Sequence, residues 1–308
     1  MIVSASRRTD LPAFYGAWLC RRFEEGFVLV RNPVNRNAVS RIILSPETVE
    51  GIVFWTKNPL PFLHRLSLFS QYPYYFECTL TPYGRDIEPF LPDKKNVLIP
   101  AIRKLSSLIG PRRVVWRYDP ILLSPVCTAA FHRRAFSEMA EALRGATLRC
   151  AVSFLDLYQH IRPAMARLRA APPTDEEKRR LLSSFAESAA RNGMELVLCA
   201  EPLDTTGLPV RRAPCIDKTL FESITGIPFK DEKDRNQRPL CRCMPSVDIG
   251  DYSTCPFGCR YCYAARRPVA KAISCDPENP LLTGHLSPDD VVKDRPMPSL
   301  RAIEESLF

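Results

Sequence analysis

The chain has 308 residues, of which 45% are hydrophobic and 25% are charged. It is long and apolar enough to bury a full core, which excludes a disordered tail, a disulfide miniprotein and a fibrous repeat. Its 43 basic and 34 acidic residues give a net charge of +9, spread along the chain, which is compatible with a polyanionic partner but does not require one.

From the N-terminus onward, short β-branched or aromatic runs alternate with amphipathic segments. Strands are predicted at 2–6, 52–56, 75–80, 114–118, 150–155 and 195–200, and helices at 12–25, 59–70, 94–109, 128–144 and 175–192. Thr174 and Glu177 have the spacing of a capping box, and residues 27–44 read as an inserted hairpin. This alternation predicts an α/β fold with a parallel sheet, either an open doubly wound sheet or a barrel.

Polar or charged residues follow nearly every predicted strand, so one edge of the sheet is expected to line a site. We expect residues 1–204 to form the core of the fold. Beyond about residue 205 the periodicity fades and cysteine density rises, so 205–308 is predicted to be a cysteine-rich region that completes the same domain.

Targeting signals are lacking in the sequence. No run approaches the roughly 18 apolar residues of a membrane helix, and the polar residues Ser4, Ser6, Arg7 and Arg8 replace the core of a signal peptide. We therefore expect a cytoplasmic protein without a membrane partner. In that reducing compartment the 12 cysteines are not expected to form disulfides, and the clustered ones become candidate metal ligands.

The strongest chemical signal is a C-x3-C-x2-C run formed by Cys255, Cys259 and Cys262. Three thiolates on one loop can hold three corners of a 4Fe-4S cluster and leave the fourth iron open to another ligand. The alternatives are a structural zinc ion, for which Cys241 or Cys243 would supply a fourth ligand, and unligated buried thiols.

A second group of cysteines is expected to converge near this loop. Its members are Cys199, Cys215, Cys241 and Cys243, which are candidate ligands of an auxiliary iron-sulfur cluster or of zinc. The polar run at 230–239 between them cannot form a core unaided, which favours a metal staple. No chemistry is assigned to the remaining cysteines, Cys20, Cys78, Cys127, Cys150 and Cys275.

The C-x3-C-x2-C loop, with Tyr261 before its third cysteine, resembles the signature loop of radical S-adenosylmethionine (SAM) enzymes. Tyr261-Cys262-Tyr263-Ala264 is similar to the spore photoproduct lyase branch in particular. In that superfamily the loop follows the first barrel strand near the N-terminus, whereas here it lies near residue 260. The resemblance therefore implies a partial TIM-like (β/α) barrel that is circularly permuted, with residues 247–250 as the displaced first strand beside the N-terminal strand.

The chain as a whole also resembles the family known as domain of unknown function 1848. The matching segments are 4–15, 53–59, 80–89, 116–122 and 236–264, which together span most of the chain. This resemblance implies a fold and a cofactor but no substrate.

Radical SAM chemistry is what these resemblances imply. The open iron would bind SAM, and one electron from a reductant such as flavodoxin or ferredoxin would release a 5'-deoxyadenosyl radical. Lys57, Tyr261 and Tyr263 would contact SAM, although Lys57 could instead pair with a carboxylate. Arg117 and Asp119 would position SAM or substrate, or neutralise each other.

The substrate is expected to be a nucleic acid or nucleotide, because of the lyase resemblance and the net positive charge. The enzyme class, whether lyase, transferase or oxidoreductase, stays open. Two other readings use the same cysteines: a zinc-stapled, non-catalytic binding module, and an iron-sulfur protein for electron transfer or sensing.

Overall fold

The computed structural model describes residues 1–266 and 275–302 and shows an α/β fold built on a large parallel sheet. The sheet has eight strands in the spatial order β10 (Ser246–Asp248), β1 (Ile2–Ala5), β4 (Gly51–Thr56), β5 (Tyr74–Thr79), β6 (Val114–Ile121), β7 (Arg149–Phe154), β8 (Glu195–Leu198) and β9 (Arg211–Arg212). Every neighbouring pair in this order is parallel, as the alternation of strands and helices predicts.

The N-terminal strand lies between two partners from distant parts of the chain. Val3 of β1 pairs with Ile52 of β4 on one side and with Val247 of β10 on the other. The expectation that the segment near residue 247 lies beside the first strand is therefore confirmed. The two end strands of this order are β9 and β10, and no pairing between them is found within the described residues, so closure of the sheet into a full barrel is not observed.

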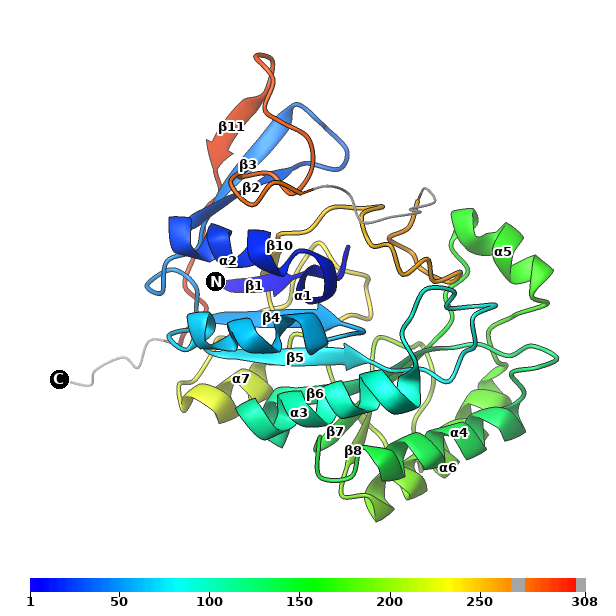
Figure 1. Ribbon diagram of the computed structural model, residues 1–308. Helices are drawn as coiled ribbons and strands as arrows, with labels where there is room; N and C mark the ends of the chain where they lie inside the picture. Colours follow the sequence, from blue (N-terminus) through cyan, green and yellow to red (C-terminus); the bar gives the residue numbers. More distant parts are fainter. Residues whose placement is uncertain (267–274, 303–308) are drawn as a thin grey trace.

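Helices connect the strands and lie against the sheet (Figure 1). Their bounds are α1 (Leu11–Phe14), α2 (Gly16–Glu25), η1 (Leu60–Phe69), η2 (Lys94–Leu98), α3 (Ile99–Ile109), η3 (Pro111–Arg113), α4 (Ala129–Ala142), η4 (Gln159–Ile161), α5 (Arg162–Arg167), α6 (Asp175–Arg191) and α7 (Lys218–Thr225). The predicted capping box is present at the start of α6, where Thr174 and Glu177 bond to each other's backbone. No helix in the described part of the chain combines the length and apolar character needed to cross a membrane.

The predicted hairpin is present, but it belongs to a second sheet. Strands β2 (Phe27–Arg31) and β3 (Ala38–Ile43) pair antiparallel, and β11 (Val291–Asp294) adds to β3 in parallel. The three strands stand apart from the main sheet in Figure 1. The partly buried Arg31 side chain pairs with Asp290 at 2.5 Å and joins the hairpin to the segment that precedes β11.

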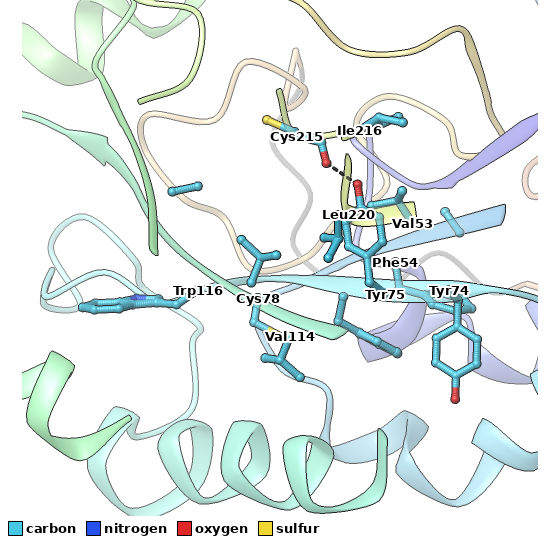
Figure 2. Packing of buried hydrophobic residues seen from close by; sticks show 14 of the residues in the cluster. Val53, Phe54, Tyr74, Tyr75, Cys78, Val114, Trp116, Cys215, Ile216 and Leu220 are labelled. Atoms are coloured by element: carbon cyan, nitrogen blue, oxygen red, sulfur yellow. Dashed lines mark hydrogen bonds between the residues drawn. The ribbon is translucent and has the colours of Figure 1, made fainter. Parts of the chain in front are cut away.

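Regular structure also occurs beyond residue 205, where the fading periodicity predicted irregular chain. Helix α7 has only eight residues, too few to be stable alone, and it is held by tertiary packing of Leu220 and Phe221. The Phe221 ring lies directly over Gly51 of β4, where an added Cβ would come within 2.2 Å of it. Nearby, the Tyr75 hydroxyl of β5 donates a hydrogen bond to the Cys215 carbonyl at 2.5 Å (Figure 2). This hydrogen bond thus holds the loop before α7 against strand β5 of the sheet.

Candidate functional site

A cavity of about 360 Å³ opens at the carboxyl ends of the parallel strands, the edge at which α/β proteins bind ligands. The charged side chains that line the cavity include Arg7, Asp10, Lys57, Arg117 and Asp119. Both predicted cysteine groups border the same cavity: Cys255, Cys259 and Cys262 on one part, and Cys199, Cys215, Cys241 and Cys243 on another. The volume is that of a typical small-molecule site.

The loop that carries Cys255, Cys259 and Cys262 follows β10 and is anchored at several points. The Tyr15 hydroxyl donates to the Thr254 carbonyl at 2.6 Å, and the Tyr263 hydroxyl donates to the Arg7 carbonyl at 2.6 Å. Burial raises the pKa of all three thiols, that of Cys259 to about 12. Without a partner, the three thiols are therefore protonated at neutral pH.

Lys57 lies at the centre of a buried polar network beneath this loop. It follows β4, and its ammonium pairs with Glu88 at 2.8 Å and donates to the Tyr261 hydroxyl, also at 2.8 Å. Tyr261 in turn donates to Glu88. The carboxylate of Asp10 accepts from the Lys57 backbone N–H at 2.6 Å, which fixes the chain at this point.

Glu88 also pairs with a second lysine, so two ammonium groups share its carboxylate. Lys94 pairs with the other oxygen of Glu88 at 2.5 Å. Burial works to raise the pKa of Glu88, but Lys57 and Lys94 outweigh it and hold the pKa at about 2. The two lysines respond differently: Glu88 outweighs burial and raises the pKa of Lys57, whereas burial prevails and lowers that of Lys94. With Asp10, whose carboxylate accepts from the Lys57 backbone N–H, the network contains two ammonium groups and two carboxylates.

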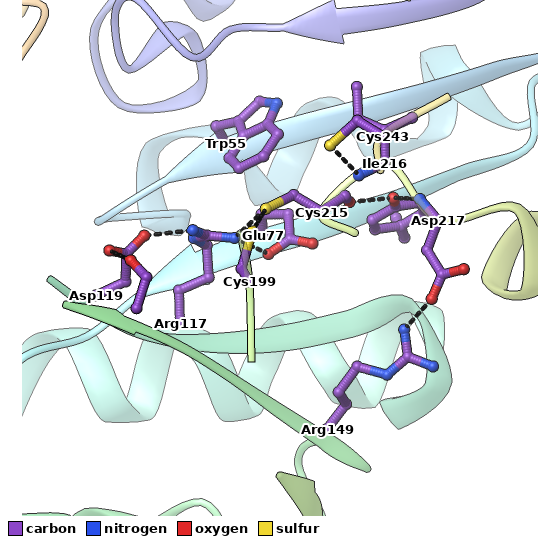
Figure 3. Close-up of polar contacts among 12 residues, drawn as sticks. Trp55, Glu77, Arg117, Asp119, Arg149, Cys199, Cys215, Ile216, Asp217 and Cys243 are labelled. Carbon is purple, nitrogen blue, oxygen red and sulfur yellow. Dashed lines mark hydrogen bonds and ion pairs between the residues drawn. The ribbon is translucent and has the colours of Figure 1, made fainter. Parts of the chain in front are cut away.

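Arg117 on β6 forms a second buried network, drawn in Figure 3. Its guanidinium pairs with Glu77 at 3.2 Å and with Asp119, and it donates to the sulfur of Cys215 at 2.9 Å. Burial raises the pKa of Glu77 to about 7, even though Arg117 opposes that shift. The indole of Trp55 lies close to two guanidinium groups, with its ring centroid 5.3 Å from the guanidinium carbon of Arg117 and 5.5 Å from that of Arg7. Arg117 and Asp119 thus form an ion pair with each other, and both border the cavity.

The four members of the second cysteine group all border the cavity. The sulfur atoms of Cys199 and Cys215 lie 3.0 Å apart, and Cys243 accepts a hydrogen bond from the Ile216 backbone N–H at 3.4 Å. All four thiols of this group are buried. As the side chains stand, no set of three or more His, Cys, Asp or Glu residues in the described ranges is arranged to hold a metal ion.

The loop that carries Cys255, Cys259 and Cys262, called the cluster loop below, nevertheless has side chains of the kind that bind an iron-sulfur cluster. Three thiols from one anchored loop border the cavity, and thiolate sulfur is the ligand that such clusters require. Lys57 borders the same cavity, and its ammonium, which pairs with Glu88, can also offset the negative charge of bound thiolates.

Two carboxylates of the site were missed in the sequence. Glu88 lies in a loop that carries no periodic pattern, so its pairing with Lys57, 31 residues away, had no local signal. Glu77 did have one, because it is the single acidic residue inside the apolar run of β5. A charged residue within a buried strand requires a partner, and Arg117 on the neighbouring strand supplies it.

The family described as "Domain of unknown function (DUF1848)" matches residues 2–264, and the chain therefore belongs to this family. A search among curated proteins finds no match. One similar solved structure comes from work on "Inhibition of the pneumococcal virulence factor StrH and molecular insights into N-glycan recognition and hydrolysis". That chain is 8% identical, with a TM-score of 0.29, over 77% of this chain and 67% of its own length. A similarity this weak has no bearing on fold or function.

Proposed function

We propose that this member of the DUF1848 family is a radical SAM enzyme, with a 4Fe-4S cluster held by Cys255, Cys259 and Cys262. The observation that carries the proposal is the position of the cluster loop. It joins β10 to the cavity wall at the carboxyl edge of a parallel sheet, and its Tyr261 is bonded to Lys57 at 2.8 Å. A three-cysteine loop and a lysine from two distant parts of the sequence thus come together at one cavity.

In this proposal the sheet is a partial TIM-like barrel in circularly permuted order. Strand β10 takes the place of the first strand, because it precedes the cysteine loop and pairs in parallel with β1. Strand β1 then takes the second place, and the remaining strands follow in chain order to β9. The parallel pairing of Val3 with Val247 supports this order.

When bound, the cluster and SAM would supply one-electron cleavage of SAM and a 5'-deoxyadenosyl radical, with the electron taken from a flavodoxin or ferredoxin. The residues of the chain hold and shield the reactants. Lys57 and Tyr261 would orient the polar end of SAM, since an ammonium and a phenol hydroxyl can both donate hydrogen bonds to a carboxylate. Tyr263 is partly exposed on the cavity wall and offers its ring to the adenosyl group.

Basic side chains around the cavity favour an anionic substrate, and we propose a nucleic acid or nucleotide. Arg7, Arg8 and Arg238 all border the cavity, and Arg8 lies 5.1 Å from the ring centroid of Tyr252. Such arginine and aromatic pairs suit phosphate groups and bases. Binding of an oligonucleotide should therefore weaken steeply as salt rises; binding that is undetectable at low salt would remove the nucleic-acid assignment.

The proposed function is tested by anaerobic purification of wild type, Cys255→Ala and the control Cys275→Ala, followed by iron and sulfide analysis. Cys275 is a partly exposed thiol outside both cysteine groups, so its loss should leave the iron content unchanged. Wild type and the control should contain iron and sulfide and should form 5'-deoxyadenosine with dithionite and SAM, and Cys255→Ala should do neither. A colourless wild type that contains zinc alone and leaves SAM intact would instead make the protein a zinc-stapled binding module. Iron and sulfide without SAM cleavage would point to electron transfer or sensing.

A further inference from the structure

Four buried thiols outside the cluster loop form one connected group. Cys199 follows β8, Cys215 follows β9, and Cys241 and Cys243 precede β10. Cys199 and Cys215 are in direct contact, with their sulfur atoms 3.0 Å apart. Cys243 lies beside Cys215, because its sulfur accepts a hydrogen bond from the backbone N–H of Ile216 at 3.4 Å, and Cys241 borders the same cavity. We call this set the four-thiol group.

Two arginines border the cavity together with the four-thiol group. The Arg117 guanidinium donates to the Cys215 sulfur at 2.9 Å, and the pair is buried (Figure 3). Arg7 borders the same cavity as Cys243 and Cys215. The Nε of Arg7 is buried without a hydrogen-bond partner. A neutral thiol is a weak acceptor, so the buried Arg117 guanidinium is better satisfied by a thiolate.

The chain around these thiols has little regular structure to hold it. Between residues 199 and 245 there are only the two-residue strand β9 and the short helix α7 among the named elements. The polar run at 230–239 is largely exposed. Four thiols from three separate segments of the chain nevertheless come together at the cavity. A metal ion that joins them would supply the folding free energy that this region lacks.

The compactness of the group favours one ion over a cluster. Zinc binds thiolate sulfur at about 2.3 Å, so the edges of its tetrahedron are about 3.8 Å. The observed 3.0 Å contact between Cys199 and Cys215 needs to open by less than about 1 Å to reach this edge. A four-iron cluster would place iron and sulfide atoms between the thiolates and require a much larger separation.

We propose that Cys199, Cys215, Cys241 and Cys243 hold one structural zinc ion. Zn²⁺ binding displaces the four thiol protons to solvent and leaves four thiolates on the metal, with Arg117 and Arg7 offsetting their charge. The ion ties the loops after β8 and β9 to the segment before β10 and so fixes one wall of the cavity. This proposal does not rest on the proposed radical chemistry, since it uses none of the cluster-loop cysteines.

The test measures zinc, iron and sulfide in the full-length chain. One variant combines Cys255→Ser, Cys259→Ser and Cys262→Ser, so that only the four-thiol group can hold metal. This variant should retain about one zinc per chain. A second variant, with Cys241→Ser and Cys243→Ser, should lose zinc at least tenfold, whereas Cys275→Ser should match wild type. Loss of iron from the first variant alone bears on the proposed function and leaves the zinc site unaffected.

A second measurement covers the case in which the Cys241 and Cys243 variant does not fold. Zinc is removed from the cluster-loop variant with a chelator, and Co²⁺ is added in its place. Four-thiolate binding should give intense thiolate-to-cobalt absorption that one equivalent of zinc abolishes. Absence of metal in the cluster-loop variant together with absence of this absorption would overturn the proposal. Iron and sulfide bound by the four-thiol group would also overturn it, as would zinc retained after loss of Cys241 and Cys243.

Discussion

Replacement of Glu88 by glutamine removes the single carboxylate that two buried lysines share. The Glu88 side chain is 1% exposed and lies 2.8 Å from the Lys57 ammonium and 2.5 Å from that of Lys94. Its pKa is about 2 instead of the usual 4.5, and a shift of this size corresponds to about 3 kcal/mol of stabilisation at neutral pH. Glu88→Gln fits the same space but leaves both ammonium groups unpaired, so the free energy of unfolding should fall by about 3 kcal/mol.

The loss can be measured by thermal and urea unfolding of the metal-free protein, followed by circular dichroism. With about 2.1 cal/mol/K of unfolding entropy per residue, Tm should drop by about 5 °C. Because the pKa of Glu88 is lowered on folding, its contribution is present above pH 4.5 and is lost as pH falls toward 2. The difference between wild type and Glu88→Gln should therefore shrink over that interval.

The matched control is Glu176→Gln, which breaks an ion pair with Arg180 on the exposed surface of α6. Exposed pairs of this kind contribute well under about 1 kcal/mol. The reasoning would be refuted if Glu88→Gln and Glu176→Gln were equally stable, or if the effect of Glu88→Gln did not change below pH 4.5.

Two further perturbations test the packing and the protonation of the core. Gly51→Ala should destabilise the fold by about 1–3 kcal/mol, because the new Cβ would lie 2.2 Å from the Phe221 ring. Adding Phe221→Leu should recover part of this loss in the double variant. If the losses of the two single variants simply added in urea unfolding, the clash would not be the cause. Burial lowers the pKa of His132 from its usual 6.5 to about 4. The neutral ring accepts a hydrogen bond from the Tyr118 hydroxyl and donates one to the Leu122 carbonyl. The free energy of unfolding should therefore fall by up to about 3 kcal/mol as pH drops from 6.5 to 4. His132→Gln should flatten that part of the stability profile, and parallel profiles would show that His132 is not responsible.

The sequence determined the strand and helix pattern to a large extent. All six predicted strands begin within one residue of an observed strand, because their apolar runs are bounded by turn residues. Thr174 and Glu177 fixed the start of α6 through a local hydrogen-bond exchange. Spacing along one loop likewise singled out Cys255, Cys259 and Cys262, and these residues do border the cavity.

Contacts between distant segments were decided only by the tertiary structure. Glu88 meets Lys57 and Tyr261 because strand β4 and the cluster loop converge at one edge of the sheet, and no local pattern encodes that convergence. Strand β11 is charged and exposed, and it exists as a strand because β3 offers it a hydrogen-bonding edge. Helix α7 is likewise stabilised by the contact of Phe221 with Gly51, about 170 residues away in the sequence. The sequence alone specified the elements that local interactions stabilise. The Glu88 network, strand β11 and helix α7 instead depend on contacts between distant segments, which contribute free energy only once the chain has folded.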